Sequence, residues 1–166
     1  HTLCTSFADT RFAGFAGRRV VTGTPVRHGL LTGDVAAGRK ALDIEDDSPQ
    51  KILLVTGGSL GAENLNRIIR DNLEALTGRF FVAHVCGVGK TVAMEQQDYL
   101  QLEFVDDGWG DLLAAADIVI SRAGANALFE WVALAKLNLL VPLPLAGSRG
   151  DQIANAQYAH EHGWSE

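Results

Sequence analysis

A single carboxylate in an apolar stretch is the first residue of this sequence whose type and position suit ligand chemistry. Glu130 lies in ISRAGANALFEWVALA, residues 120–135, where a glycine turn leads into a helical pattern that is otherwise apolar or small. An ionised carboxylate has two acceptor oxygens, which suit the two hydroxyls of a ribose diol. The helix dipole also favours a Glu near a helix start, so the local pattern leaves a diol ligand and an ordinary surface position both open.

A glycine-rich turn, TGGSLGAENLN at residues 56–66, is suited to phosphate binding. Gly57 and Gly58 permit a tight strand-to-helix turn, Ser59 takes a helix-capping position, and Gly61 allows a ligand close to the backbone. Free backbone N–H groups and the helix dipole would bind a phosphate here. A plain turn with a capping serine explains the pattern equally well. The spacing is not G-x-G-x-x-G and the turn lacks the lysine of a P-loop, so neither a nicotinamide enzyme nor a P-loop nucleotidase is predicted.

Two further polar groups follow strand-like runs. In FVDD, Asp106 and Asp107 could bind a metal ion, although capping a helix or holding a turn is their more common role. Val105 before them could offer backbone groups to a flat base. In GDQIANA, the polar side chains of Asp151, Gln152 and Asn155 could contact sugar hydroxyls, or Asp151 could simply cap the next helix.

All these positions follow strands in a regular alternation that starts at Lys51. Such an alternation predicts βαβ units and therefore an α/β fold, a doubly wound, Rossmann-like parallel sheet with helices on both faces. Ligands of such sheets bind beyond the carboxyl ends of the strands. We expect strands in residues 51–58, 79–87, 102–107, 117–121 and 137–144, and helices in 62–76, 90–97, 108–116, 124–136 and 150–163.

Composition narrows the class of protein. The 166 residues are 47% hydrophobic and 20% charged, which predicts one globular domain with a proper core. A net charge of -6 argues against electrostatic binding of nucleic acid. No apolar run approaches the ~18 to 20 residues of a membrane span. Cys4 and Cys86 are expected to be reduced thiols of a cytosolic protein. Because the chain starts at His1 and contains only one methionine, Met94, we expect an excised piece of a longer protein.

Five motifs together, TGTPVR, GGSLGAENLN, FVDD, SRAGANALFEWVALAK and VPLPLAGSRGDQIANA, resemble the C-terminal half of the MurG family of bacterial peptidoglycan glycosyltransferases. The resemblance runs from about Thr22 to the end, and the form SRGDQI is most similar to Gram-positive members. It implies one half of a GT-B fold, in which two Rossmann-like domains face a cleft. Residues 1–48 would be a leading, interdomain segment with a short strand at 18–23, and residues 49–166 would be the nucleotide-sugar domain, truncated at its end.

The resemblance also implies the activity. Family members transfer N-acetylglucosamine (GlcNAc) from UDP-GlcNAc to a lipid-linked muramyl pentapeptide, converting lipid I to lipid II, as peripheral proteins at the cytoplasmic face of the bacterial membrane. The acceptor site and the proposed catalytic base belong to the N-terminal half. We therefore expect no catalytic residue, metal or cofactor in this chain, and no transfer by this chain alone.

The resemblance assigns a role to each matching position. Two of the positions with an implied contact depart from the common pattern: Ala127 replaces a frequent Thr, and Asp151 replaces a Gln of some members. The implied contacts are Arg27, Gly58, Ser59 and Gly61 at the diphosphate, Val105 at uracil, Gly124, Ala125, Asn126 and Ala127 at the diphosphate and sugar, Glu130 at the ribose, and Asp151, Gln152 and Asn155 at the GlcNAc.

Two alternative functions remain open at this point. The chain could be the soluble donor-binding subunit of a two-chain UDP-GlcNAc transferase of N-glycan assembly. It could also be a non-catalytic nucleotide-binding module, which would show no preference for UDP over other nucleotides.

Overall fold

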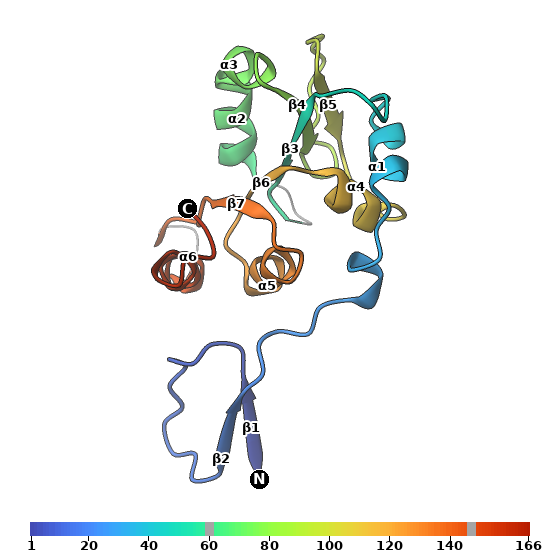
Figure 1. Cartoon of the computed structure of the whole chain (residues 1–166). Helices are drawn as coiled ribbons and strands as arrows, with labels where there is room; N and C mark the ends of the chain where they lie inside the picture. Colours follow the sequence, from blue (N-terminus) through green and yellow to red (C-terminus); the bar gives the residue numbers. More distant parts are fainter. Residues whose placement is uncertain (59–61, 146–148) are drawn as a thin grey trace.

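A five-stranded parallel sheet forms the centre of the computed structural model, which describes residues 1–58, 62–145 and 149–166. Its strands lie in the order β5-β4-β3-β6-β7 and are all parallel (Figure 1). This order reverses direction at β3, as a doubly wound sheet does. The strands are β3 (Lys51–Thr56), β4 (Phe80–Val85), β5 (Tyr99–Leu102), β6 (Ile118–Ser121) and β7 (Leu137–Leu140).

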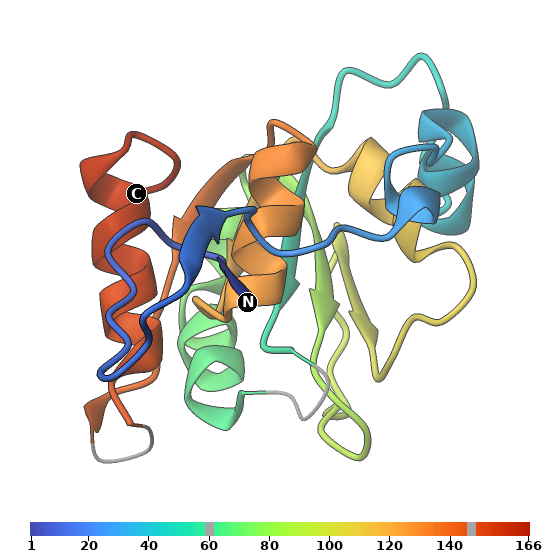
Figure 2. The ribbon, with the colours of Figure 1, turned by 90° about the horizontal axis from the view of Figure 1, so that it is seen from below.

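Helices cover both faces of this sheet because its central strands are apolar on both sides. In β3, Ile52 and Leu54 join one buried cluster while Leu53 and Val55 join another. The first cluster lies under η1 (His28–Leu30), α1 (Val35–Ala41), α4 (Trp109–Ala115) and α5 (Ala125–Ala133), and the second lies under α2 (Glu63–Asp71). α3 (Leu73–Thr77) packs on β4, and α6 (Asp151–Glu161) lies beside α5 (Figure 2). The predicted doubly wound α/β fold is confirmed.

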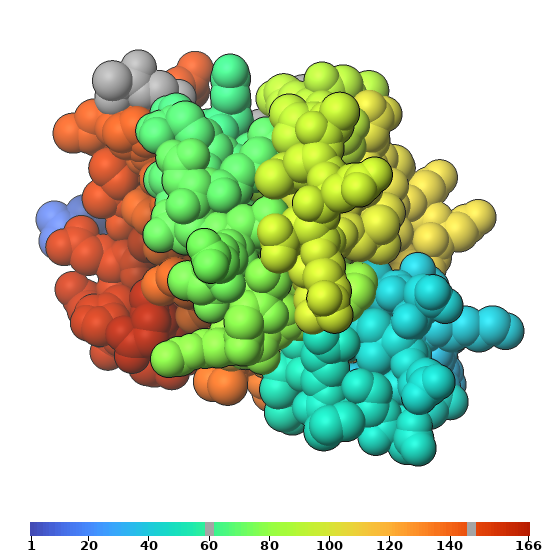
Figure 3. Space-filling view, turned by 90° about the horizontal axis from the view of Figure 1, so that it is seen from above, coloured from blue at the N-terminus to red at the C-terminus, as the bar shows by residue number. Residues whose placement is uncertain are grey.

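Two sequence predictions about the helices are wrong. Residues 62–76 do not form one helix, because the backbone leaves the helical conformation at Asn72, between α2 and α3. Residues 91–96 are not helical. There the Gln101 side chain pairs with both backbone polar groups of Val92, and Gln96 donates to the Thr77 hydroxyl (3.2 Å). Figure 3 shows this part of the chain packed beside α3. Side-chain bonds to the backbone therefore replace helical ones.

The strand predicted at residues 102–107 is displaced along the chain. The structure places β5 at Tyr99–Leu102, where it pairs with Val82–Val85 of β4. The residues from Glu103 to Asp107 therefore follow the strand and are free to shape a loop at its carboxyl end.

The leading segment contains a small separate sheet. β1 (Thr2–Thr5), which the sequence did not predict, pairs in parallel with β2 (Arg18–Val21), which it did (Figure 1). Phe7 packs against Phe129 of α5 and Tyr158 of α6, at ring-centroid distances of 5.3 and 5.1 Å.

The part of the leading segment that follows β2 packs differently. Leu30, Leu42 and Ile44 are buried in the same cluster as β3 and α4. The division of the chain at residue 48 stays a prediction. No helix within the described residues is long and apolar enough to cross a membrane.

Candidate functional site

A cavity of about 350 Å³ opens at the carboxyl ends of the central strands. The last residues of β3, β4 and β6 (Thr56, Val85 and Ser121) all reach its wall. This is the edge at which doubly wound sheets bind ligands. Among the residues that the structure describes, the lining consists of Arg27, Thr56, Gly57, Gly58, Val85, Glu103, Phe104, Val105, Asp106, Trp109, Ser121, Arg122, Gly124, Ala127, Glu130, Trp131 and Gln152.

Seven of the thirteen residues with an implied ligand contact line this one cavity: Arg27, Gly58, Val105, Gly124, Ala127, Glu130 and Gln152. Four others, Ala125, Asn126, Asp151 and Asn155, are not among its lining residues. Ser59 and Gly61 lie outside the described residues. Segments as far apart as residues 27 and 152 therefore meet at one site.

Glu130 faces the cavity from α5, with only 16% of its side chain exposed. Burial raises the pKa of this carboxyl, and the charge of Arg27, whose Nη2 lies 3.7 Å from Glu130 Oε1, offsets part of that rise. Trp131, the next residue, donates from Nε1 to Ser121 Oγ (2.9 Å) and so ties α5 to the end of β6. The helix thus presents a half-buried acceptor of two hydrogen bonds to the cavity.

Two backbone features at the cavity suit an anion. Gly58 has φ +85°, a conformation that residues with a Cβ rarely adopt, and a Cβ on Gly57 would lie 2.5 Å from the Ala62 nitrogen. The turn after β3 therefore requires glycine, as predicted. At the start of α5, Gly124 is the N-cap residue and has no side chain to cap the first N–H groups. Those N–H groups and the helix dipole favour negative charge at this end of the cavity.

Arg122 is the lining residue that the sequence predictions missed most clearly. It is 9% exposed and donates from Nη1 to the carbonyls of Val141 (3.0 Å) and Pro142 (3.2 Å). Its Nε has no hydrogen-bond partner among the described residues, and burial lowers its pKa. The sequence signal that could have indicated Arg122 was its position directly after β6. Other residues also follow strands directly, so this position alone did not distinguish Arg122.

Two aromatic side chains at the cavity were also missed. Phe104 directly precedes Val105 in the sequence and Trp109 follows it by four positions; both line the cavity, and Phe104 is 56% exposed although it is large and apolar. Flat apolar side chains near a backbone segment are suited to contact with a planar base. The available sequence signal was that both residues follow β5.

Two polar side chains of α6 bond to the backbone just beyond β7 and β6. Gln152 Oε1 accepts from the Leu143 backbone nitrogen (3.2 Å), and Asn155 Nδ2 donates to the Ala123 carbonyl (2.9 Å). Gly150 occupies the N-cap position of α6, so Asp151 does not cap this helix. Of these residues only Gln152 reaches the cavity.

The carboxylates at the cavity do not form a metal-binding group within residues 1–58, 62–145 and 149–166. Asp106 lines the cavity and Asp107 does not. Glu103 accepts from the Gly89 backbone nitrogen (2.9 Å) and so joins the loops that follow β4 and β5. The cavity therefore offers cations and free N–H groups at one part, a carboxylate beside them, and flat apolar groups at another.

Comparison with known proteins identifies the family. Residues 52–166 match the glycosyltransferase family 28 C-terminal domain, which covers most of the chain. The chain belongs to this family. The resemblance of its motifs to the MurG family is thereby confirmed at the level of the domain.

Two relatives of this family 28 chain carry the same name. The chain is similar to the UDP-N-acetylglucosamine–N-acetylmuramyl-(pentapeptide) pyrophosphoryl-undecaprenol N-acetylglucosamine transferases of Clostridium tetani (43% identical, covering 98% of the chain and 46% of the relative) and Lachnospira eligens (44%, with the same coverage). Clostridial relatives fit the Gram-positive form of SRGDQI. The chain spans just under half the length of these curated relatives.

Solved structures agree with the family. The crystal structure of Acinetobacter baumannii MurG matches with a TM-score of 0.69 and 26% identity, covering 99% of this chain and 46% of that one. The glycosyltransferase VinC, solved in complex with dTDP, matches with a TM-score of 0.54, 18% identity and coverage of 73% and 29%, which shows a shared fold. The GT-B half-fold predicted from the sequence is confirmed.

Proposed function

We propose that this chain is the donor-binding domain of an inverting N-acetylglucosaminyltransferase that converts lipid I to lipid II. The observation that carries the proposal is the single cavity that brings Arg27, Glu130 and Gln152 together at the strand ends. The names of the relatives support the choice of UDP-GlcNAc as the donor and of an undecaprenyl-linked muramyl pentapeptide as the acceptor.

The proposed binding mode follows from the chemistry of the cavity. Glu130 accepts hydrogen bonds from the two ribose hydroxyls, and the uracil lies near the backbone of Val105. The diphosphate lies at the start of α5, near Gly124 and the Arg27 guanidinium. The GlcNAc extends toward Gln152 and the loop after β7, with Asp151 and Asn155 of α6 beyond it.

Five further residues of the proposed diphosphate and sugar contacts belong to the segments that follow β3 and β6. Ser59 and Gly61 belong to the turn after β3, outside the described residues, and stay predicted phosphate contacts. Ala125, Asn126 and Ala127 form the first turn of α5, whose backbone N–H groups would face the diphosphate.

The proposed reaction is a direct displacement at the anomeric carbon. The acceptor's sugar hydroxyl attacks that carbon, loses its proton to a base outside this chain, and UDP leaves from the opposite side. This chain contributes stabilisation of the leaving diphosphate by Arg27 and by fixed N–H dipoles, which are already oriented before charge develops. No metal or other cofactor takes part in the proposal, and no residue of this chain is proposed as catalytic.

The proposed function also implies a location and partners for the full-length protein. The full-length protein would act peripherally at the cytoplasmic face of the bacterial membrane, because its acceptor is lipid-linked. It would not bind nucleic acid. The chain described here would bind the donor without transferring sugar.

Calorimetric titration tests the donor site. We expect UDP-GlcNAc to bind more tightly than UDP-GalNAc and GDP-mannose. Equal binding of all three would support a general nucleotide module, and absence of UDP binding would refute the donor site. Sugar transfer by this chain alone would refute the proposal that the catalytic base lies outside it.

A variant of Glu130 tests the ribose contact. Glu130→Ala is expected to lower the affinity for UDP by about tenfold, which is the scale of hydrogen bonds to a charged group, and to lower the affinity for dUDP much less. Glu74→Ala, which removes an exposed carboxylate from α3, is the matched control and should change neither the affinity for UDP nor that for dUDP. Equal losses of affinity for UDP and dUDP in Glu130→Ala would contradict a contact between Glu130 and the ribose hydroxyls.

A further inference from the structure

Glycines allow the segment after Arg27 to pack backbone-to-backbone on α4. A Cβ on Gly33 would lie closer than 3.0 Å to the Gly110 carbonyl oxygen, and one on Gly38 would lie equally close to the Asp111 carbonyl oxygen. A Cβ on Gly110 would lie 2.6 Å from the Gly29 carbonyl oxygen. All three partners are backbone atoms, which cannot rotate away as a side chain can. Any larger residue would therefore move η1 and α1 relative to α4.

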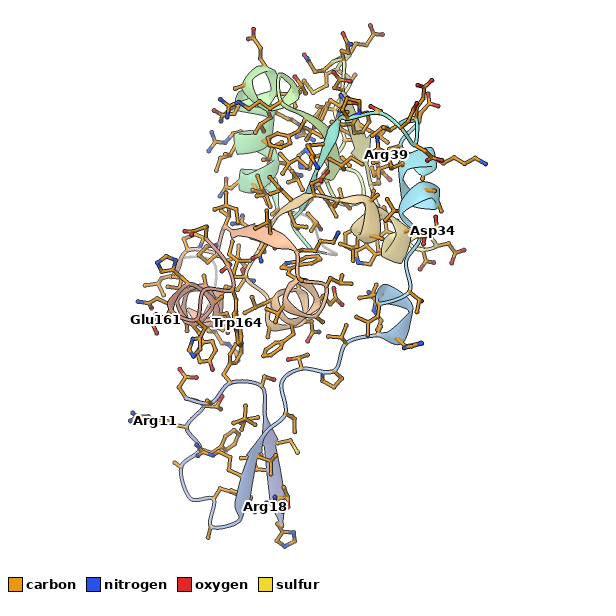
Figure 4. All side chains as sticks on the ribbon, viewed as in Figure 1. Arg11, Arg18, Asp34, Arg39, Glu161 and Trp164 are labelled. Atoms are coloured by element: carbon orange, nitrogen blue, oxygen red, sulfur yellow. The ribbon has the colours of Figure 1, made fainter. Side chains whose placement is uncertain are left out.

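Hydrogen bonds join the same two segments. The Asp34 backbone nitrogen donates to Asp111 Oδ1 (2.8 Å), and Asp34 Oδ1 accepts from the Ala37 nitrogen as the N-cap of α1 (2.7 Å). Figure 4 shows Asp34 at the start of α1, next to α4. The contact is therefore a fixed junction of two elements.

Both sides of this junction lead directly to the cavity. On one side, the Arg27 carbonyl accepts from the Leu30 nitrogen (3.1 Å), and Leu30 is buried, so the backbone of Arg27 is fixed to η1. On the other side, Trp109 precedes Gly110 in α4 and lines the cavity. Residues 22–27 before η1 form neither helix nor strand. Arg27 also lies outside residues 52–166, which match the family domain.

We propose that Gly33, Gly38 and Gly110 are positioning residues, whose contact between η1–α1 and α4 holds the Arg27 guanidinium at the cavity beside Glu130. The proposed role of Arg27 at the diphosphate rests on the proposed function. The role of the glycines in placing Arg27 does not. A guanidinium that is held in place before the ligand arrives loses less conformational entropy on binding than one on a free segment.

A carboxyl titration tests the positioning without any ligand. Arg27 lowers the pKa of Glu130 against the rise caused by burial, so withdrawal of the guanidinium raises that pKa further. The other charged residues of the cavity, Glu103, Asp106 and Arg122, are unchanged in every variant. We expect carbon-13 NMR of the Glu130 carboxyl to show a higher pKa in both Arg27→Ala and Gly110→Ala, and no further rise in the double variant.

Gly29→Ala is the matched control. Gly29 lies in the same segment, but a Cβ there meets nothing within 4 Å, so the Glu130 pKa should stay at the wild-type value. A Glu130 pKa that is unchanged in Gly110→Ala, or that rises further when Gly110→Ala is added to Arg27→Ala, overturns the proposal. Where Gly110→Ala does not fold, Asp111→Ala removes the bond to the exposed Asp34 nitrogen and should raise the pKa in the same direction. An unchanged pKa in that variant also overturns the proposal.

Binding of uridine and UDP to the same variants tests whether the position of Arg27 affects binding of the diphosphate. Gly110→Ala should lower the affinity for UDP by about tenfold, which is the scale of one charge-assisted hydrogen bond, and should leave the affinity for uridine within about twofold of the wild-type value. When it is added to Arg27→Ala, it should lower the affinity for UDP no further. Equal loss for uridine and UDP would indicate general disruption and overturn the role in binding. Failure of the wild type to bind UDP would refute the proposed function alone, because the titration stands without it.

Discussion

Acidification should destabilise this domain through one buried histidine. His84 in β4 is fully buried, and its ring nitrogens bond to Tyr99 Oη (2.9 Å) and Asn66 Oδ1 (3.0 Å). Burial, together with the nearby charge of Arg70, lowers the pKa of His84 from 6.5 to about 4. Between these two values the unfolded chain holds a proton that the native ring does not accept.

The size of the effect follows from that difference. Each pKa unit corresponds to roughly 1.4 kcal/mol, so the change from 6.5 to about 4 gives about 3 kcal/mol. Because the native pKa is the lower one, this stability is fully present above pH 6.5, is lost as the pH falls, and is gone at about pH 4. A loss of this size is a large fraction of the roughly 5–15 kcal/mol that stabilises a typical domain.

Urea unfolding followed by circular dichroism at a series of pH values measures this loss. His84→Gln should be less stable than the wild type at neutral pH, but its free energy of unfolding should fall much less between about pH 6.5 and 4. Tyr99→Phe is the control, because it removes a partner of the ring but keeps the buried imidazole and therefore the pH dependence. Equal pH dependence in the wild type and His84→Gln would refute the reasoning.

Three further predictions concern the site and its support. Glu130→Gln should raise the melting temperature at neutral pH, because burial raises the pKa of Glu130 and its ionised form therefore costs stability above that pKa; scanning calorimetry measures this, and an unchanged melting temperature would contradict it. Asp117→Ala should reduce the free energy of unfolding by about 1–3 kcal/mol in urea titration, because Asp117 Oδ2 accepts from the Ile52 nitrogen at the start of β3 (2.8 Å). Trp131→Phe should destabilise the protein through the cavity that it leaves and the lost bond to Ser121, and a double-mutant cycle with Ser121→Ala in the same assay should give a coupling of about 1 kcal/mol for that bond; a coupling near zero would contradict it.

Much of the site was predictable because it depends on chain order. Apolar runs that end in glycine or polar residues predicted the strands, and parallel strands bring their carboxyl ends to one edge. That is why Glu130 and Gln152 could be placed at one ligand site before their geometry was known, whereas only the resemblance to the MurG family placed Arg27 there. The turn at Gly57 and Gly58 was predictable for a similar reason, since only glycine fits its backbone.

The errors came where side chains compete with the backbone. The helical pattern of residues 90–97 did not reveal that Gln101, from the next strand, satisfies the Val92 backbone instead. Arg122 was not singled out from the sequence, yet it is buried against the carbonyls of Val141 and Pro142. Neither outcome is determined locally, because the partner residues lie 9 to 20 positions away.

The sequence by itself determined the alternation of strands and helices, the sheet with two buried faces, and the glycines and polar residues at its carboxyl edge. These features follow from periodicity and backbone conformation, which are properties of neighbouring residues. Only the tertiary structure decided which of those residues share the cavity. The packing of η1 and α1 on α4 places Arg27 within 3.7 Å of Glu130, across 103 positions of sequence, and no local pattern specifies a contact of that separation.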